Sequence, residues 1–253
     1  MEKIFIENKL GEKIAILIDK AVKPAGLAFI AHGLGDNKDS LHIQKIAEIF
    51  LNNNYSVVRF DTRNTFGESA GKFEDATVTN YLEDLEEVIN WSKKQDFFIS
   101  PFILCGHSIG SMTAAVYAEK HPQEVKALAP FSAVVNAELS KEQYSPEELK
   151  NWQDSGWLVE DWDGREIRLK YAYWQSKMKY DLLPAVDKLT MPVLLVVGEN
   201  DHCTLPRHQK ILFDRLSGEK EFHIIKDAPH TFRSEKNLQE LQIILDNWLK
   251  TLN

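Results

Sequence analysis

The stretch that most constrains the fold of this chain covers residues 101–112. Its first five residues are mainly apolar and predict a buried strand, and the small residues from Ser111 onward predict a helix. Between them, residues 106–110 read Gly-His-Ser-Ile-Gly, which fits the pattern G-x-S-x-G. A sharp strand-to-helix turn of this kind strains the backbone of its central residue and exposes its side chain beside the positive end of a helix. We therefore expect Ser108 to be a nucleophile.

Apolar runs alternate with helix-forming segments along most of the rest of the chain. The first two strand-like runs alternate in the strand period and predict an antiparallel hairpin at a sheet edge. The next run, at residues 26–31, is continuously apolar, which suits a strand buried on both faces. Strands are predicted over residues 4–6, 14–18, 26–31, 55–60, 101–105, 125–130, 193–197 and 222–225. With helices between them, this order predicts an α/β fold with a mostly parallel, doubly wound sheet of about eight strands.

Residues 132–189 interrupt this alternation, because their composition shifts towards tryptophan, tyrosine and charged residues. Trp162-Asp163-Gly164 lies between two strand-like runs, and Asp-Gly is a strong hairpin signal. Ser145-Pro146 begins a helix with a capping residue and a proline at the first position. We predict one domain over residues 1–253, with residues 132–189 inserted as a cap of helices and a small hairpin above the strand ends. Most of its aromatic residues are expected to form the cap's own small core.

A serine hydroxyl needs an adjacent base, and that base needs an acid to orient it. Asp201 follows the apolar strand predicted over 193–197, and His230 lies in the loop after the strand predicted over 222–225. The order Ser108, Asp201, His230 is the one expected for α/β-hydrolases. We predict that these three residues are catalytic.

Other acids and histidines compete for these roles. The rival acids are Glu199, Asp214 and Asp227, of which Asp227 stands only three residues before the predicted histidine. The rival histidines are His202, His208 and His223, and none of them follows the last strand as His230 does.

A tetrahedral intermediate needs two backbone N–H groups aimed at its developing oxyanion. The residue after the nucleophile, Ile109, should supply one of them. The second should come from the glycine-rich turn at residues 32–35, which allows close backbone approach. We predict that this second donor is the N–H of Leu34.

Charge and composition exclude several classes of partner. The formal net charge is −8, which argues against nucleic acid or an anionic membrane as a partner. Two cysteines, Cys105 in a strand and Cys203 in a loop, favour a reducing compartment over a disulfide framework.

There is no apolar run of the roughly 20 residues that a membrane span needs, and no signal-type N-terminus, so we expect a cytoplasmic protein. No cluster of histidine, cysteine and acidic residues has ligand spacing, so no metal or cofactor is expected. The sequence leaves a homodimer open.

With these motifs in place, the chain resembles the α/β-hydrolase superfamily over nearly its whole length, and within it the bacterial cinnamoyl (feruloyl) esterase group. The shared motifs lie at residues 32–33, 59–61, 67–69, 71–75, 106–110, 198–201 and 230–232. The run at 71–75 and a cap of the right size point to the esterase group, in which the cap and the oxyanion loop frame a pocket for an aromatic acyl group. Asn64-Thr65-Phe66 replaces the relatives' glycine-rich turn, and Ile109 stands where the group often has glutamine. Both departures bear on the substrate and not on the hydrolase chemistry.

The resemblance and the predicted triad together imply a serine carboxylic-ester hydrolase. It would act through an acyl-enzyme on small-molecule esters of small or aromatic, cinnamoyl-type acids. A thioesterase, a monoacylglycerol lipase or a peptidase-like acyl hydrolase would use the same three residues. A non-catalytic binding module on the same fold is the alternative from another class, and it usually has lost a member of the triad.

Overall fold

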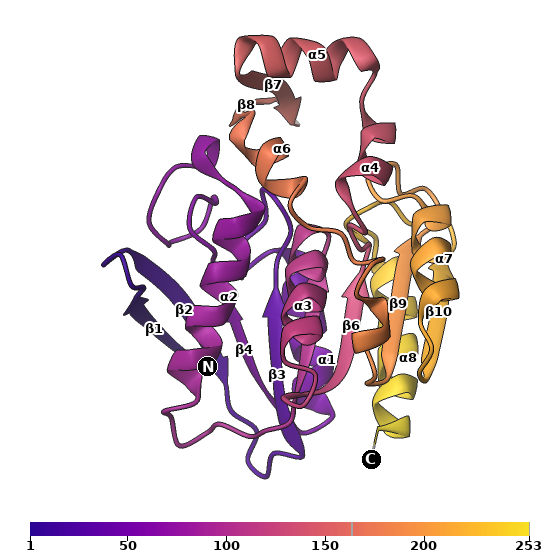
Figure 1. The fold of residues 1–253 in the computed structure, drawn as a ribbon. Coiled ribbons are helices and arrows are strands. Elements are labelled where there is room, and N and C mark those ends of the chain that lie inside the picture. The colour runs from indigo at the N-terminus through magenta and orange to yellow at the C-terminus, as the bar shows by residue number, and fades with distance from the viewer. Residues whose placement is uncertain (163, 253) are drawn as a thin grey trace.

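A mixed sheet of eight strands forms the centre of the computed structural model, which describes residues 1–162 and 164–252 (Figure 1). Its strands are β1 (Glu2–Glu7), β2 (Lys13–Asp19), β3 (Gly26–Ala31), β4 (Tyr55–Phe60), β5 (Phe102–His107), β6 (Val125–Phe131), β9 (Val193–Gly198) and β10 (Lys220–Ile225). Their order across the sheet is β1-β2-β4-β3-β5-β6-β9-β10. β2 is antiparallel to both β1 and β4, and the other neighbours are parallel. The predicted fold class and edge hairpin are confirmed.

Helices cover both faces of the sheet, and each face has its own apolar core. The larger helices are α1 (Leu41–Asn52), α2 (Val78–Ser92), α3 (Ile109–Lys120), α7 (Pro206–Arg215) and α8 (Glu235–Thr251). α1 and α8 bury residues such as Ile46 and Leu245 against one face. α2 and α3 bury residues such as Leu85 and Met112 against the other. Strands β3, β4 and β5 are buried at every position, which explains why their sequences are mainly apolar.

Within the segment predicted as a cap, residues 132–189, the part from residue 137 to residue 177 stands beyond the carboxyl ends of the parallel strands (Figure 1), and η3 (Val186–Lys188) near its end packs against α3 and α7. It contains the helices α4 (Ala137–Ser140), α5 (Pro146–Ser155) and α6 (Ala172–Lys177) and the antiparallel hairpin β7 (Trp157–Trp162) with β8 (Arg165–Lys170). α5 begins with the expected capping box of Ser145 and Glu148. The hairpin turn was predicted at residues 162–164, of which Asp163 lies outside the described residues.

Short 3-10 helices connect the larger elements at Phe73–Asp75 (η1), Lys141–Gln143 (η2) and Val186–Lys188 (η3). Within the described part of the chain, no helix combines the length and the apolar character that crossing a lipid bilayer requires.

Candidate active site

Ser108 occupies the sharp turn between β5 and α3. Its backbone has φ 54° and ψ −118°, a strained left-handed conformation that residues other than glycine rarely adopt. Its N–H donates to the carbonyl oxygen of Phe131 on β6 at 2.9 Å, which fixes the turn against the neighbouring strand. The side chain is partly exposed although both of its neighbours, His107 and Ile109, are buried. The structure therefore places Ser108 as the turn motif predicts.

Glycine is required on both sides of this turn because backbone segments pass close to it. A Cβ atom on Gly106 would lie 2.4 Å from the carbonyl oxygen of Gly110. A Cβ atom on Gly110 would lie 2.4 Å from the carbonyl oxygen of Ala31 on β3. Side chains at these positions would push α3 away from the sheet and move Ser108 with it.

Asp201 and His230, which are 29 residues apart in sequence, meet at the carboxyl ends of β9 and β10. Nδ1 of His230 lies 2.8 Å from Oδ2 of Asp201. Asp201 is only 1% exposed, and its other oxygen accepts the N–H groups of Cys203 and Thr204 at 2.9 and 2.8 Å. The Thr204 hydroxyl donates to Oδ2 at 2.8 Å. The carboxylate is thus fixed by several donors and can hold the imidazole ring in one orientation.

These contacts also set the charges of the pair. Burial favours the neutral form of Asp201, but the hydrogen bond and charge of His230 and the Thr204 N–H outweigh it and lower the pKa of Asp201 to about 2. Burial lowers the pKa of His230 below its usual value, and the hydrogen bond to Asp201 opposes this shift. At neutral pH the pair is therefore an ionised carboxylate beside a neutral imidazole, which is the state that a general base needs.

The loop of His230 is attached directly to the serine turn. Nε2 of His107, the residue before Ser108, lies 2.8 Å from the carbonyl oxygen of His230. The Ser132 hydroxyl donates to the same oxygen at 3.3 Å. The His107 and His230 rings lie 4.7 Å apart between centroids. Through these contacts the fold brings Ser108, Asp201 and His230 into one region.

The two predicted oxyanion donors flank this region. Neither the N–H of Leu34 nor that of Ile109 has an acceptor among residues 1–162 and 164–252. The loop of Leu34 is anchored by His32, whose Nε2 accepts the N–H of Thr62 at 3.0 Å. Nδ1 of His32 therefore carries the proton and donates to the carbonyl oxygen of Gly33 at 2.7 Å. The sequence analysis did not single out this anchoring role of His32.

The rival residues take other partners. The Glu199 side chain accepts the N–H of Asp227 at 3.0 Å, and Asp227 lies 3.6 Å from Lys236. The other rivals are paired elsewhere or exposed: Asp214 with Lys210, His208 with Glu142, His223 with Glu221, and His202 at the surface. None of these residues forms a hydrogen bond or ion pair with Ser108, Asp201 or His230 within the described chain.

The hairpin of the predicted cap contacts the loop that carries Leu34. A Cβ atom on Gly35, whose φ is +76°, would lie 2.4 Å from the Trp162 ring of β7. Trp162 also packs edge-on against Phe73, with 5.7 Å between centroids, and Phe73 stacks on Phe66 at 4.4 Å. Phe66 belongs to the departure at residues 64–66, so this departure contributes to an aromatic wall beside the site.

Lys177 on α6 is a second residue that the sequence analysis missed. It is 3% exposed, and its ammonium lies 5.0 and 5.1 Å from the ring centroids of Tyr173 and Trp174. No carboxylate in the described part of the chain forms an ion pair with it. Burial lowers the pKa of Lys177 to about 8, and the nearby Cys203 opposes this shift.

Known proteins resemble this chain in both sequence and fold. Residues 22–160, more than half of the chain, match the family described as serine aminopeptidase, S33. A mitochondrial palmitoyl-protein thioesterase, ABHD10 of Bos taurus, is 24% identical over 91% of this chain and 75% of its own length. A monoacylglycerol lipase of Mycolicibacterium smegmatis is 25% identical over 88% of this chain and 86% of its own length.

Two solved structures share the fold over almost the whole length of both chains. Est1E of Butyrivibrio proteoclasticus with bound ferulic acid has a TM-score of 0.85 at 24% identity and covers 98% of each chain. ABHD10 from mouse has a TM-score of 0.83 at 19% identity and covers 100% of each chain. The expected superfamily is confirmed: this chain belongs to the serine aminopeptidase S33 family of the α/β-hydrolases.

Proposed function

We propose that the protein is a serine carboxylic-ester hydrolase in which Ser108, His230 and Asp201 form the catalytic triad. The observation that carries this proposal is the 2.8 Å contact of His230 Nδ1 with the buried Asp201, in a loop tied to the strained turn of Ser108. A histidine so oriented directs its other ring nitrogen away from the acid and can serve as a general base.

The proposed reaction has an acylation step and a deacylation step. His230 Nε2 removes the proton of the Ser108 hydroxyl as its oxygen attacks the ester carbonyl. The N–H groups of Leu34 and Ile109 stabilise the oxyanion of the tetrahedral intermediate. His230 returns the proton to the leaving alcohol, and a water molecule activated by the same ring then releases the acid from the acyl-enzyme. Asp201 holds the ring in the required tautomer and stabilises its charged form.

For the acyl group we propose small or aromatic acids of the cinnamoyl type. Trp162, Phe66 and Phe73 place aromatic surface beside the oxyanion loop, which favours a flat apolar acyl group. The ferulic acid bound to Est1E, whose fold this chain shares, supports the same choice. Thioesters and monoacylglycerols are the competing substrates, because relatives carry those names. The family description, serine aminopeptidase, makes peptides with a free N-terminus a further competing substrate.

The decisive experiment compares methyl ferulate, p-nitrophenyl acetate, a palmitoyl thioester, a monoacylglycerol and an aminoacyl p-nitroanilide in parallel. We expect methyl ferulate and p-nitrophenyl acetate to be hydrolysed fastest. Ser108→Ala should lose this activity while keeping its far-UV spectrum and unfolding midpoint, and Ser217→Ala, at an exposed serine, is the matched control. Activity retained in Ser108→Ala would exclude the proposed mechanism.

A fluorophosphonate probe separates the enzyme from a non-catalytic binding module. The proposal predicts stoichiometric labelling of Ser108 in the folded protein. A folded protein that is neither labelled nor active on any of the five substrates would instead be a binding module on a hydrolase fold.

A further inference from the structure

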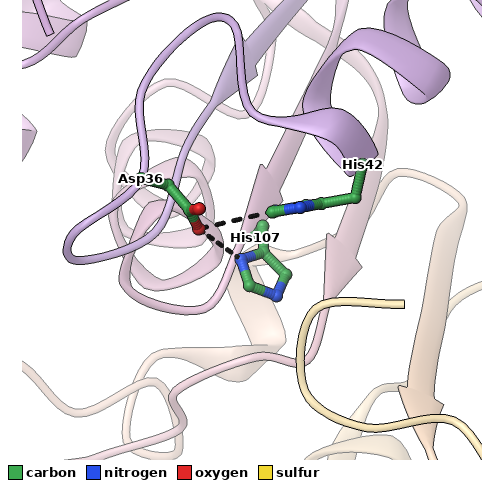
Figure 2. A group of neighbouring side chains, drawn as sticks. All are labelled: Asp36, His42 and His107. Atoms are coloured by element: carbon green, nitrogen blue, oxygen red, sulfur yellow. Dashed lines mark ion pairs between the residues drawn. The ribbon is translucent and has the colours of Figure 1, made fainter. Parts of the chain in front are cut away.

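Three buried or partly buried side chains from separate segments converge on one another (Figure 2). Asp36 lies in the loop after β3, His42 in the first turn of α1, and His107 at the end of β5. The two histidines are 3% and 1% exposed, and Asp36 is partly exposed with a side chain at 19%. One donor atom from each residue lies within 4.8 Å of the other two.

Both histidines direct a nitrogen at the same carboxylate oxygen, at ion-pair distance (Figure 2). His42 Nε2 and His107 Nδ1 each lie 3.5 Å from Asp36 Oδ2, beyond the usual 2.7–3.2 Å of a hydrogen bond. Both nitrogens are buried and have no hydrogen-bond partner. Buried ring nitrogens are normally paired, so this arrangement calls for a group between them.

The tautomer of His107 gives a second reason to expect a bound group between the two histidines and Asp36. Its Nε2 lies 2.8 Å from the carbonyl oxygen of His230, and a carbonyl oxygen can only accept. Nε2 therefore carries a proton, and in the neutral ring Nδ1 presents a lone pair to the Asp36 carboxylate. Two facing lone pairs repel each other unless a cation lies between them.

We propose that Asp36, His42 and His107 form a binding site for a divalent zinc-class metal ion. Zinc binds imidazole nitrogen at about 2.0–2.1 Å and carboxylate oxygen at about 2.0–2.2 Å, so donors on one tetrahedral ion lie roughly 3.3 Å apart. The two nitrogen–oxygen separations of 3.5 Å are close to this value. Two imidazoles with one carboxylate suit zinc, whereas magnesium and calcium prefer oxygen donors.

The surroundings also match a metal site. A histidine ligand usually donates its second N–H to a carbonyl or carboxylate, and the His107 bond to His230 supplies that contact. Three protein ligands leave a fourth position, and the partial exposure of Asp36 gives that position access to water. This site departs from the expectation of no metal, which considered spacing along the chain and not proximity in the fold.

The second group of candidate ligands, Asp201, Cys203 and His230, provides an internal contrast. There the histidine nitrogen already lies 2.8 Å from the carboxylate, and both carboxylate oxygens accept further hydrogen bonds. The Asp201 oxygens and His230 Nδ1 are therefore already hydrogen-bonded. Only the group at Asp36 combines ligand geometry with unpaired nitrogens among the described residues.

The proposed metal site lies directly beside the proposed oxyanion loop. A Cβ atom on Gly33 would lie 2.9 Å from His107 Nδ1, 3.1 Å from Asp36 Oδ2 and 3.1 Å from Ser108 Cβ. A bound ion would therefore join the loop of Leu34 to the base of the serine turn. The site does not depend on the proposed hydrolysis, and its test uses binding and not turnover.

The test is calorimetric titration of metal-free protein with Zn²⁺ at pH 7.5, in a Cys203→Ser background that removes the thiol of the second group. We expect one equivalent of Zn²⁺ to bind and the thermal midpoint to rise with it. Asp36→Asn and His42→Gln should each weaken binding at least about 10-fold, because they remove ligands and the loss of even an outer-shell contact typically costs about 10-fold or more. His223→Gln, at the partly exposed pair with Glu221, is the matched control and should bind as before.

Several results would overturn the proposal. The first is that the parent protein binds no more Zn²⁺ than the Asp36→Asn protein does. The second is that folded His42→Gln binds Zn²⁺ with unchanged affinity. The third is that the site binds Mg²⁺ as tightly as Zn²⁺. If no zinc binds and NMR shows a proton on both nitrogens of His107, the group is an ion pair of His107 with Asp36. Thermal unfolding of each variant without metal establishes that it is folded before its affinity is compared.

Discussion

The protonation state of His230 controls the pH dependence of the proposed reaction. The ring must be neutral to accept the serine proton, so activity is lost as pH falls through its pKa. Burial places that pKa below the ordinary value of 6.5. We expect kcat/KM for p-nitrophenyl acetate to rise with pH along a limb centred below about 6.5 and then to stay level up to about pH 8. A limb centred above pH 7 would contradict His230 as the base.

Asp201 contributes by orienting this ring, and its removal tests that role. Asp201→Asn keeps the shape of the side chain but allows the wrong tautomer of His230, which in serine proteases lowers kcat by on the order of 10⁴. We expect a loss of this size with the fold intact, measured by steady-state kinetics and circular dichroism. Asp227→Asn, at the exposed rival acid, is the control and should keep most of the activity. The reverse ranking would make Asp227 the catalytic acid.

At the scale of elements, the contact of α3 with β3 depends on Gly110. An alanine there would place its Cβ 2.4 Å from a backbone oxygen that belongs to the sheet and cannot turn aside. We expect Gly110→Ala to lower the free energy of unfolding by an amount at or above the upper end of the about 1–3 kcal/mol typical of overpacking. Urea denaturation measures this change.

Gly218→Ala is the matched control, because its nearest contact would be 3.3 Å away and its φ is not positive. It should unfold within about 0.5 kcal/mol of the parent protein. Equal stability of the two variants would show that the close approach of α3 to β3 is not required.

Helices and strands could be predicted from the sequence where apolar residues recur in a regular pattern or a strong start signal is present. Strands such as β3 and β9 stand out because their residues are continuously apolar, and α5 stands out because Ser145-Pro146 is a strong start signal. α4 and α6 were not predicted, since helices of four and six residues show little periodicity. α6 matters nonetheless, because it carries Lys177.

At the scale of the whole molecule, the sequence predicts where residues lie along the fold but not which side chains meet. The order of Ser108, Asp201 and His230 can be read because parallel strands end at one edge of the sheet. Asp36, His42 and His107 come from a loop, a helix and a strand, and no motif links them. Their proximity therefore appears only in the folded molecule.

The buried charge of Lys177 lowers the free energy of unfolding, and a substitution can remove this destabilisation. Its pKa is about 8 in the folded protein, against about 10.4 in an unfolded chain. A base whose pKa falls on folding destabilises the folded state at pH 7, where both states are charged, by about 3 kcal/mol. The cost disappears as pH rises from about 8 to about 10.4, because the folded protein then loses its proton before the unfolded chain does.

Lys177→Met keeps the volume of the side chain and removes the buried charge. We expect it to raise the free energy of unfolding at pH 7 by about 1–3 kcal/mol, since the lost contacts with Tyr173 and Trp174 offset part of the gain. Urea denaturation at pH 7 and pH 10 should show this gain shrink at the higher pH. Lys179→Met, at an exposed lysine nearby, should show no gain at either pH. An equal effect of both substitutions would mean that the Lys177 ammonium is already compensated in the folded protein.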